Sequence, residues 1–140
     1  MQKHASYDDV VGTVRDYLAG RAAAAAAGGV QEVWIDPGIG FGKTAAHNLL
    51  LLRYFRPLVD TGWPVLVGTS RKSFLGALSA GPGEEATPAE DRLEATIAST
   101  TWAIVQGAAM VRVHDVVPAV QAAQLAGEAP SLAPREDPWR

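Results

Sequence analysis

Residues that could do chemistry lie in three polar segments, each at the end of a short apolar run. The segments are residues 36–43 (Asp-Pro-Gly-Ile-Gly-Phe-Gly-Lys), residues 68–73 (Gly-Thr-Ser-Arg-Lys-Ser) and residues 112–115 (Arg-Val-His-Asp). If the three apolar runs are parallel strands, their polar ends meet at one edge of the sheet, where α/β proteins bind ligands. The spacing therefore predicts one site built from all three segments.

The first segment offers a carboxylate and a glycine-rich turn. Asp36 at the tip of a buried strand needs hydrogen-bond donors, and it could accept two parallel N–H bonds from the amidine-like edge of a guanine or pterin ring. A turn-forming or helix-capping role is the structural alternative for this carboxylate. The glycines let the backbone approach a ligand. No acidic residue ends the next strand, so the segment is not a dinucleotide fingerprint.

The second and third segments are basic. Residues 70–73 are expected to open a short helix, whose N–H groups attract anions, so that Lys72 could contact a ring and the serines a carboxylate. A basic helix start at the surface is the alternative. Arg112 and His114 are two residues apart on a strand and point to the same side, where they could grip a diphosphate. Asp115 either orients His114 or caps the last helix.

Alternating helix and strand patterns position these segments. Helices are expected over about residues 6–27, 45–57, 71–78, 89–106 and 118–126, the second with a bend or an end at Pro57. Strands are expected over about residues 31–36, 64–68 and 109–113. Ser6 and Thr44 are the expected N-caps of the first and second helices. One apolar face of the fourth is expected to carry Leu93, Ile97, Thr101, Ile104 and Val105. The alternation predicts an α/β fold with parallel strands and right-handed crossovers. Three strands leave two open edges, so we expect the chain to be part of a larger barrel.

The overall composition is that of an ordinary globular domain. The 140 residues are 48% hydrophobic and 19% charged, and a net charge of −3 with no basic cluster argues against a nucleic-acid partner. Without cysteine there is neither a disulfide nor a thiolate metal site, and no metal-ligand spacing occurs. The N-terminus lacks the apolar core of a signal peptide, and no run reaches membrane-spanning length. We therefore expect a cytoplasmic protein with no membrane partner.

In order and spacing, the three segments resemble the C-terminal motifs of the dihydropteroate synthase family, and Ala-His-Asn at 46–48 fits the same pattern. The resemblance covers about residues 7–127. It implies the C-terminal portion, about strands 6–8 and flanking helices, of a (β/α)₈ TIM barrel, whose usual length is about 250 residues. Residues 1–128 would form this partial pterin-binding domain and residues 129–140 a disordered tail.

The resemblance also implies a reaction and roles for the site. The family condenses 6-hydroxymethyl-7,8-dihydropterin diphosphate with 4-aminobenzoate to give 7,8-dihydropteroate and pyrophosphate. By resemblance, Lys72, Arg112 and His114 are catalytic, Lys72 contacting the ring while the other two hold the diphosphate. Asp36 would bind the amino edge of the pterin, and Phe41 and Ser73 would line the aminobenzoate side. Mg²⁺ would be bound through the substrate diphosphate, with its main protein ligand in the missing N-terminal half, and the full-length parent would be a homodimer.

Other interpretations remain open at this point. The fragment alone is expected to be inactive, because the N-terminal motifs of the family have no counterpart in it. A non-catalytic pterin-binding paralogue would keep the same pocket floor. A methyltetrahydrofolate–corrinoid methyltransferase-like domain shares the pterin-binding barrel but does not need residues that bind a diphosphate. A remnant that does not fold alone is the fourth interpretation.

Overall fold

The structure is a computed structural model that describes residues 6–127. The predicted tail, residues 129–140, lies outside the described residues. In chain order the elements are α1 (Val10–Ala27), α2 (Ala45–Arg53), α3 (Arg56–Val59), β1 (Leu66–Val67), α4 (Ser73–Ser79), the 3₁₀ helix η1 (Ala89–Asp91), α5 (Leu93–Val105), β2 (Met110–Val111) and α6 (Val116–Ala126). The chain is thus a mixed α/β protein, as the alternation of patterns predicted.

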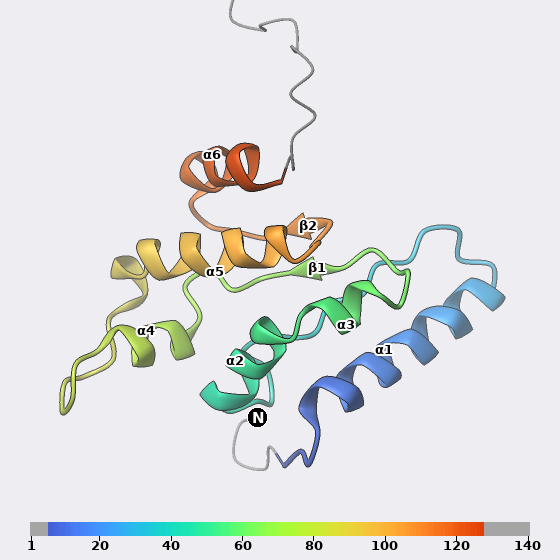
Figure 1. Cartoon of the computed structure of the whole chain (residues 1–140), viewed down its shortest axis with the longest axis horizontal. Helices are drawn as coiled ribbons and strands as arrows, with labels where there is room; N and C mark the ends of the chain where they lie inside the picture. Colours follow the sequence, from blue (N-terminus) through green and yellow to red (C-terminus); the bar gives the residue numbers. More distant parts are fainter. Residues whose placement is uncertain (1–5, 128–140) are drawn as a thin grey trace, which may run out of the picture.

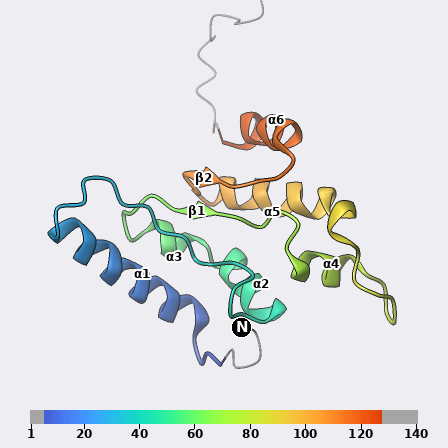
Figure 2. The same ribbon diagram turned by 180° about the vertical axis from the view of Figure 1, so that it is seen from behind.

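Three extended segments run parallel through the middle of the molecule. β1 pairs with β2 in the register Leu66–Met110, and the segment before the first polar turn joins β1 through a single bridge between Ile35 and Val65. The predicted strand over 31–36 is therefore reduced to one bridge. Figure 1 and Figure 2 show α1, α2 and α3 on one side of these segments and α5 and α6 on the other. The parallel order brings the ends of all three segments to one edge.

The helices begin where side-chain caps are available. Asp9, and not the predicted Ser6, caps α1, because its carboxylate accepts a hydrogen bond from the backbone N of Gly12. Thr44 caps α2 as its sequence position indicated, and His47 completes a capping box by accepting from the Thr44 backbone N. The chain then breaks after Arg53, and α3 follows with Pro57 in its first turn.

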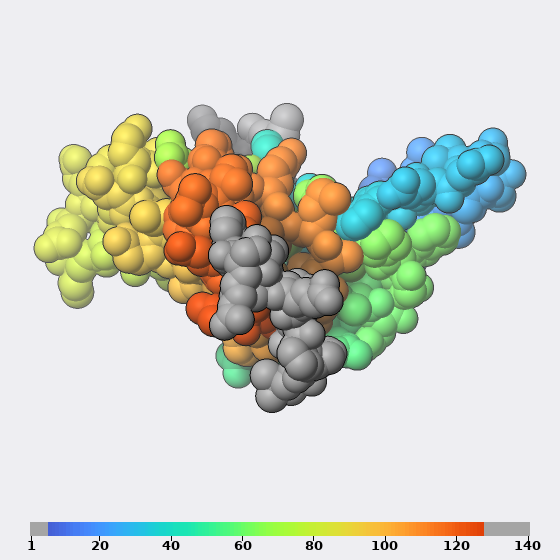
Figure 3. All heavy atoms as spheres, turned by 90° about the horizontal axis from the view of Figure 1, so that it is seen from above, coloured from blue at the N-terminus to red at the C-terminus, as the bar shows by residue number. Residues whose placement is uncertain are grey.

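The core lies between the two helical layers. Its fully buried members include Leu51, Phe55, Leu58, Val65 and Val67. Seen from above, the molecule is elongated, with α1 at one end and the loop after α4 at the other (Figure 3). None of the helices in the described part of the chain is long and apolar enough to cross a membrane.

The most buried face of α5 is not the apolar face that the sequence predicts. The buried side chains of this helix are Thr96, Thr100 and Ala103, while Val105 is 59% exposed. The reason is a polar interface: the Thr100 hydroxyl lies 3.4 Å from that of Thr69, just beyond β1. The helix therefore covers the end of the strand with hydroxyls that hydrogen-bond the loop, and its larger apolar side chains remain more exposed.

Candidate functional site

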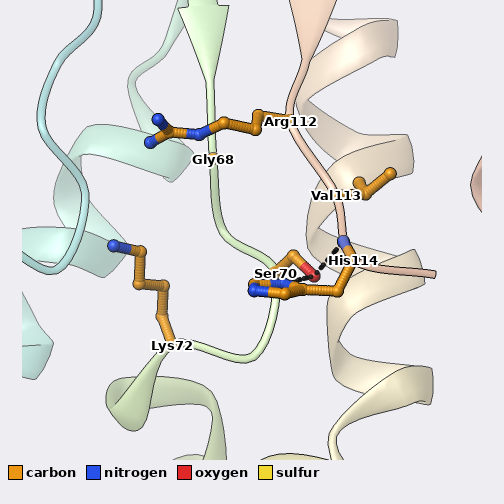
Figure 4. A pocket seen from close by; sticks show the side chains of 6 residues that line it. All are labelled: Gly68, Ser70, Lys72, Arg112, Val113 and His114. Carbon is orange, nitrogen blue, oxygen red and sulfur yellow. Dashed lines mark hydrogen bonds between the residues drawn. The ribbon is translucent and has the colours of Figure 1, made fainter. Parts of the chain in front are cut away.

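A pocket of about 350 Å³ opens at the ends of β1 and β2. The residues that line it come from the loops that follow the two strands: Gly68, Ser70, Lys72, Arg112, Val113 and His114. In Figure 4 the ends of the Lys72, Arg112 and His114 side chains point to the same side of the strands, whereas Val113 points the other way. The predicted convergence of the second and third polar segments is therefore present in the structure.

The turn that carries Asp36 is held rigidly by its own polar groups. The Asp36 carboxylate accepts a hydrogen bond of 2.8 Å from the Gly38 backbone N, so the turn-forming interpretation is confirmed for one of its oxygens. Asn48, buried in α2, accepts from the Gly40 backbone N at 2.8 Å. The buried Lys43 ammonium donates to the backbone oxygens of Gly38 and Phe41, each at 3.2 Å. Burial lowers the pKa of Lys43 although Asp36 acts to raise it.

Lys72 crosses from the second loop to this turn. Its ammonium lies 3.8 Å from the centre of the Phe41 ring, a cation–π contact. Its stem passes Gly40 so closely that a Cβ there would lie 2.9 Å from the Lys72 Cδ, and the φ of +82° at Gly40 also favours glycine. Burial and the charge of Arg112 lower the pKa of Lys72, whereas Asp36 acts to raise it. The ammonium is thus fixed over the pocket and easier to deprotonate than a free lysine.

Arg112 lies along the backbone at the end of β1. A Cβ at Gly68 would be 3.3 Å from both Nε and Nη2 of Arg112, so the glycine leaves room for the guanidinium. Arg112 Nη2 is 3.9 Å from Asp36 Oδ2, a long ion pair across the pocket mouth. The Arg112 side chain is 64% exposed, and most of its donors therefore face solvent.

His114 is oriented by Ser70 and not by Asp115. The Ser70 hydroxyl lies 2.9 Å from His114 Nδ1 and accepts a bond of 3.1 Å from the His114 backbone N. The hydroxyl can donate to an unprotonated Nδ1 or accept from a protonated one, and in either case Ser70 holds the Nδ1 side of the ring. The Asp115 carboxylate binds Arg71 instead, so the predicted orientation of His114 by Asp115 is wrong. Asp115 does occupy the predicted N-cap position of α6, but its side chain makes no capping hydrogen bond.

The predicted site residues divide into two groups. The pocket is lined by Lys72, Arg112 and His114. Asp36 contacts Arg112 through the ion pair, and Phe41 contacts Lys72 through the cation–π interaction. Ser73 is exposed and lines a neighbouring pocket of about 390 Å³, together with Asn48 and Phe74. The helix it opens begins at residue 73, two residues later than predicted.

Sequence reasoning missed two residues that shape the site. Ser70 was considered only as a ligand for a carboxylate, but it positions His114. Asn48 fixes the glycine turn and also donates to the Thr44 backbone O at 2.9 Å. Its place one turn into a helix that follows a glycine-rich loop is the signal that could have found it, since an amide there can reach back to the loop.

The described residues do not form a metal site of their own. Residues 6–127 contain no group of three or more His, Cys, Asp or Glu side chains that could hold an ion. The pocket combines Lys72, Arg112 and His114 with one nearby carboxylate, Asp36. This donor set repels a divalent cation and attracts an anion.

A basic pocket at the ends of parallel strands is typical of α/β proteins that bind anionic ligands. The sequence pattern of the family described as "Pterin binding enzyme" matches residues 1–114, and the chain belongs to this family.

The most informative relatives are dihydropteroate synthases. The chain is 45% identical over 119 residues to that of Neisseria meningitidis serogroup C, covering 83% of this chain and 40% of the relative. It is 47% identical over 124 residues to that of Mycobacterium leprae, covering 87% and 44%. The crystal structure of the Thermus thermophilus enzyme in complex with 4-aminobenzoate superposes with a TM-score of 0.80 at 41% identity, covering 89% of this chain and 47% of that one. The chain thus spans less than half the length of these relatives.

Proposed function

We propose that this chain is the pterin- and diphosphate-binding portion of a dihydropteroate synthase, corresponding to about strands 6–8 of a (β/α)₈ barrel, with residues 1–128 forming the partial domain. The observation that carries the proposal is the gathering of Lys72, Arg112 and His114 around one pocket, with Asp36 at its mouth. The solved structures of similar synthases support this choice of substrates, because they include complexes with 6HMPPP, with 4-aminobenzoate and with 7,8-dihydropteroate.

The charges of the pocket suit the leaving group of the proposed reaction. The reaction forms a bond between the amine nitrogen of 4-aminobenzoate and the exocyclic methylene carbon of the pterin. The carbon–oxygen bond to the diphosphate breaks, pyrophosphate leaves with the bonding electrons, and the amine releases a proton. Arg112 and His114 would stabilise the negative charge that grows on the departing oxygen. Such stabilisation accelerates the step because it is strongest in the transition state.

Recognition of the ring would fall to the other side of the pocket. One Asp36 oxygen is occupied by the Gly38 backbone N, and a carboxylate retains further lone pairs for the amino edge of a pterin. Lys72 would reach a ring carbonyl or nitrogen from the position where it covers Phe41. Phe41 and Ser73 would line the aminobenzoate side, Ser73 from the neighbouring pocket.

Several parts of the proposal concern the whole parent protein. We place it in the cytoplasm as a homodimer that acts on small molecules. Because the described residues do not fit a metal, Mg²⁺ would come with the substrate diphosphate and would have its main protein ligand outside this chain.

The proposal is tested by joining this chain to the preceding part of the Mycobacterium leprae relative. The joined protein is expected to form 7,8-dihydropteroate and pyrophosphate, and the 140-residue chain alone is expected to form neither. The Lys72→Ala form of the joined protein is the matched inactive control. A joined protein that folds and binds pterin without condensing it would support a non-catalytic pterin-binding paralogue and refute the proposal.

A further inference from the structure

Arg71 has an unusual backbone conformation for its residue type. Its φ is +58°, and it is the only non-glycine residue of the described chain with a positive φ. The left-handed region is unfavourable for a residue with a Cβ, and such a conformation persists only where the surroundings hold it. Arg71 stands between Ser70, which binds His114, and Lys72, which contacts Phe41. The backbone conformation of Arg71 therefore determines the relative positions of Ser70 and Lys72, whose side chains line the pocket.

Four hydrogen bonds hold Arg71 in place. Its guanidinium binds the Asp115 carboxylate through two bonds, from Nη2 to Oδ1 at 2.8 Å and from Nε to Oδ2 at 3.2 Å. Its backbone N donates to the Thr96 hydroxyl at 3.1 Å, and its backbone O accepts from Arg92 Nη1 at 2.8 Å. Asp115 lies between β2 and α6, whereas Arg92 and Thr96 lie at the start of α5, so Arg71 is fixed to two separate segments.

The Arg71–Asp115 pair connects two parts of the protein, and Arg71 does not line the pocket. Two nitrogen atoms of the Arg71 guanidinium donate to one carboxylate, and this bidentate geometry gives the strongest hydrogen bonding available to an arginine. Arg71 is absent from the residues that line the pocket. The hydrogen bond between the two groups lowers the pKa of Asp115 and raises that of Arg71, so both stay ionised at neutral pH. Asp115 follows His114 directly, and the pair therefore ties the Lys72 loop to the His114 loop.

We propose that the Arg71–Asp115 ion pair is a positioning clamp that sets the distance between Lys72 and His114 so that both act on one diphosphate-bearing ligand. This inference deepens the proposed function and rests on it for the identity of the ligand. The Ser70–His114 hydrogen bond forms a second link between the same two loops. Two links are needed because one alone would let the loops rotate about it, and a displacement of about 1 Å is enough to weaken a preorganised site.

The first experiment measures binding of inorganic pyrophosphate to the 140-residue chain by calorimetry. The variants are Arg71→Gly, Arg71→Lys and Asp115→Asn. Glycine accepts the positive φ, so Arg71→Gly removes the clamp without adding backbone strain. The matched control is Asp60→Asn, which breaks the exposed ion pair of Asp60 with Arg56 on the opposite layer. We expect each clamp variant to bind about tenfold more weakly, and the double variant Arg71→Gly/Asp115→Asn to lose no more than either single change.

The second experiment needs no ligand. Nitrogen-15 NMR of the ligand-free chain follows the backbone amide of Lys72 and the ring nitrogens of His114. If the clamp positions the two loops, the His114 ring nitrogens shift in Arg71→Gly and the Lys72 amide shifts in Asp115→Asn, each probe lying on the loop that was not substituted, and both stay unchanged in Asp60→Asn. A loss of stability without a change at the pocket would leave them in place. Unchanged signals, or pyrophosphate binding equal to that of the unsubstituted chain, would overturn the clamp. If the unsubstituted joined protein also fails to bind pyrophosphate, the proposed function fails, and the NMR signals still decide the clamp.

Discussion

Replacing Gly76 by alanine should destabilise this protein although it adds a good helix former. Gly76 lies in the middle of α4, where a Cβ would come within 2.4 Å of Arg92 Nε and 2.5 Å of the Thr87 backbone O. Arg92 cannot move aside freely, because its Nε donates to that same oxygen at 2.7 Å and its Nη1 donates to the Arg71 backbone O at 2.8 Å. The new methyl group must therefore displace Arg92 or the loop.

The size of the effect follows from three contributions. Overpacking costs about 1–3 kcal/mol, and losing a hydrogen bond from a charged donor costs about 1.5 kcal/mol more. The higher helix propensity of alanine returns up to about 1 kcal/mol. We expect Gly76→Ala to lower the free energy of unfolding by about 2 kcal/mol.

Gly20 provides the matched control for this substitution. It lies in the interior of α1, is exposed, and has no atom within 4 Å of the position a Cβ would take. Gly20→Ala should therefore raise the free energy of unfolding by about 0.5–1 kcal/mol. Urea denaturation followed by circular dichroism at the helix band measures both variants. A Gly76→Ala variant as stable as Gly20→Ala would refute the close packing of Arg92 against α4.

Three further predictions concern the pocket. In the joined protein, Lys72→Ala or Arg112→Ala should abolish condensation with the circular dichroism spectrum and Tm unchanged; unsubstituted rates in either would overturn the site. Asp36→Asn should weaken pterin binding by about tenfold or more, through lost charge-assisted hydrogen bonds, and leave 4-aminobenzoate affinity unchanged; equal losses in the two titrations would contradict its role. Because burial and Arg112 lower the pKa of Lys72 from 10.5, pyrophosphate affinity should fall with rising pH before pH 10.5. Asp36→Asn should move this fall to lower pH and Arg112→Ala to higher pH, and a profile flat to pH 10.5 would refute the assignment.

The parallel order and the gathering of the site could be predicted because they depend on local patterns. Short apolar runs such as residues 65–67 end in polar segments, and a parallel sheet brings such ends to one edge. The cap at Thr44 was predicted for the same reason, since it needs only residues within one helical turn. An interruption of this helix was also predicted, but at Pro57, whereas α2 ends at Arg53 and Pro57 lies in the first turn of α3.

The features that escaped prediction depend on partners far away in the chain. The helix predicted from residue 71 begins at residue 73, because Asp115 and Thr96 hold Arg71 in a left-handed conformation. The buried face of α5 was not predicted, because hydrophobic periodicity considers only apolar side chains. Thr96 and Thr100 are buried because their hydroxyls hydrogen-bond the loop after β1. A local pattern contains no information about a hydrogen bond across tens of residues.

The charge balance of the pocket favours a diphosphate ligand over a neutral one. Lys72 and Arg112 lie close enough for the charge of Arg112 to lower the pKa of Lys72, and Asp36, at 3.9 Å from Arg112, offsets this only in part. Together, Lys72 and Arg112 therefore hold more positive charge than the Asp36 carboxylate compensates. A methyl-donating folate would leave this repulsion in place, because its pterin ring carries no anion. In the proposed reaction, a pterin diphosphate would relieve this repulsion on binding, and Arg112 and His114 would stabilise the further negative charge that grows on the departing pyrophosphate.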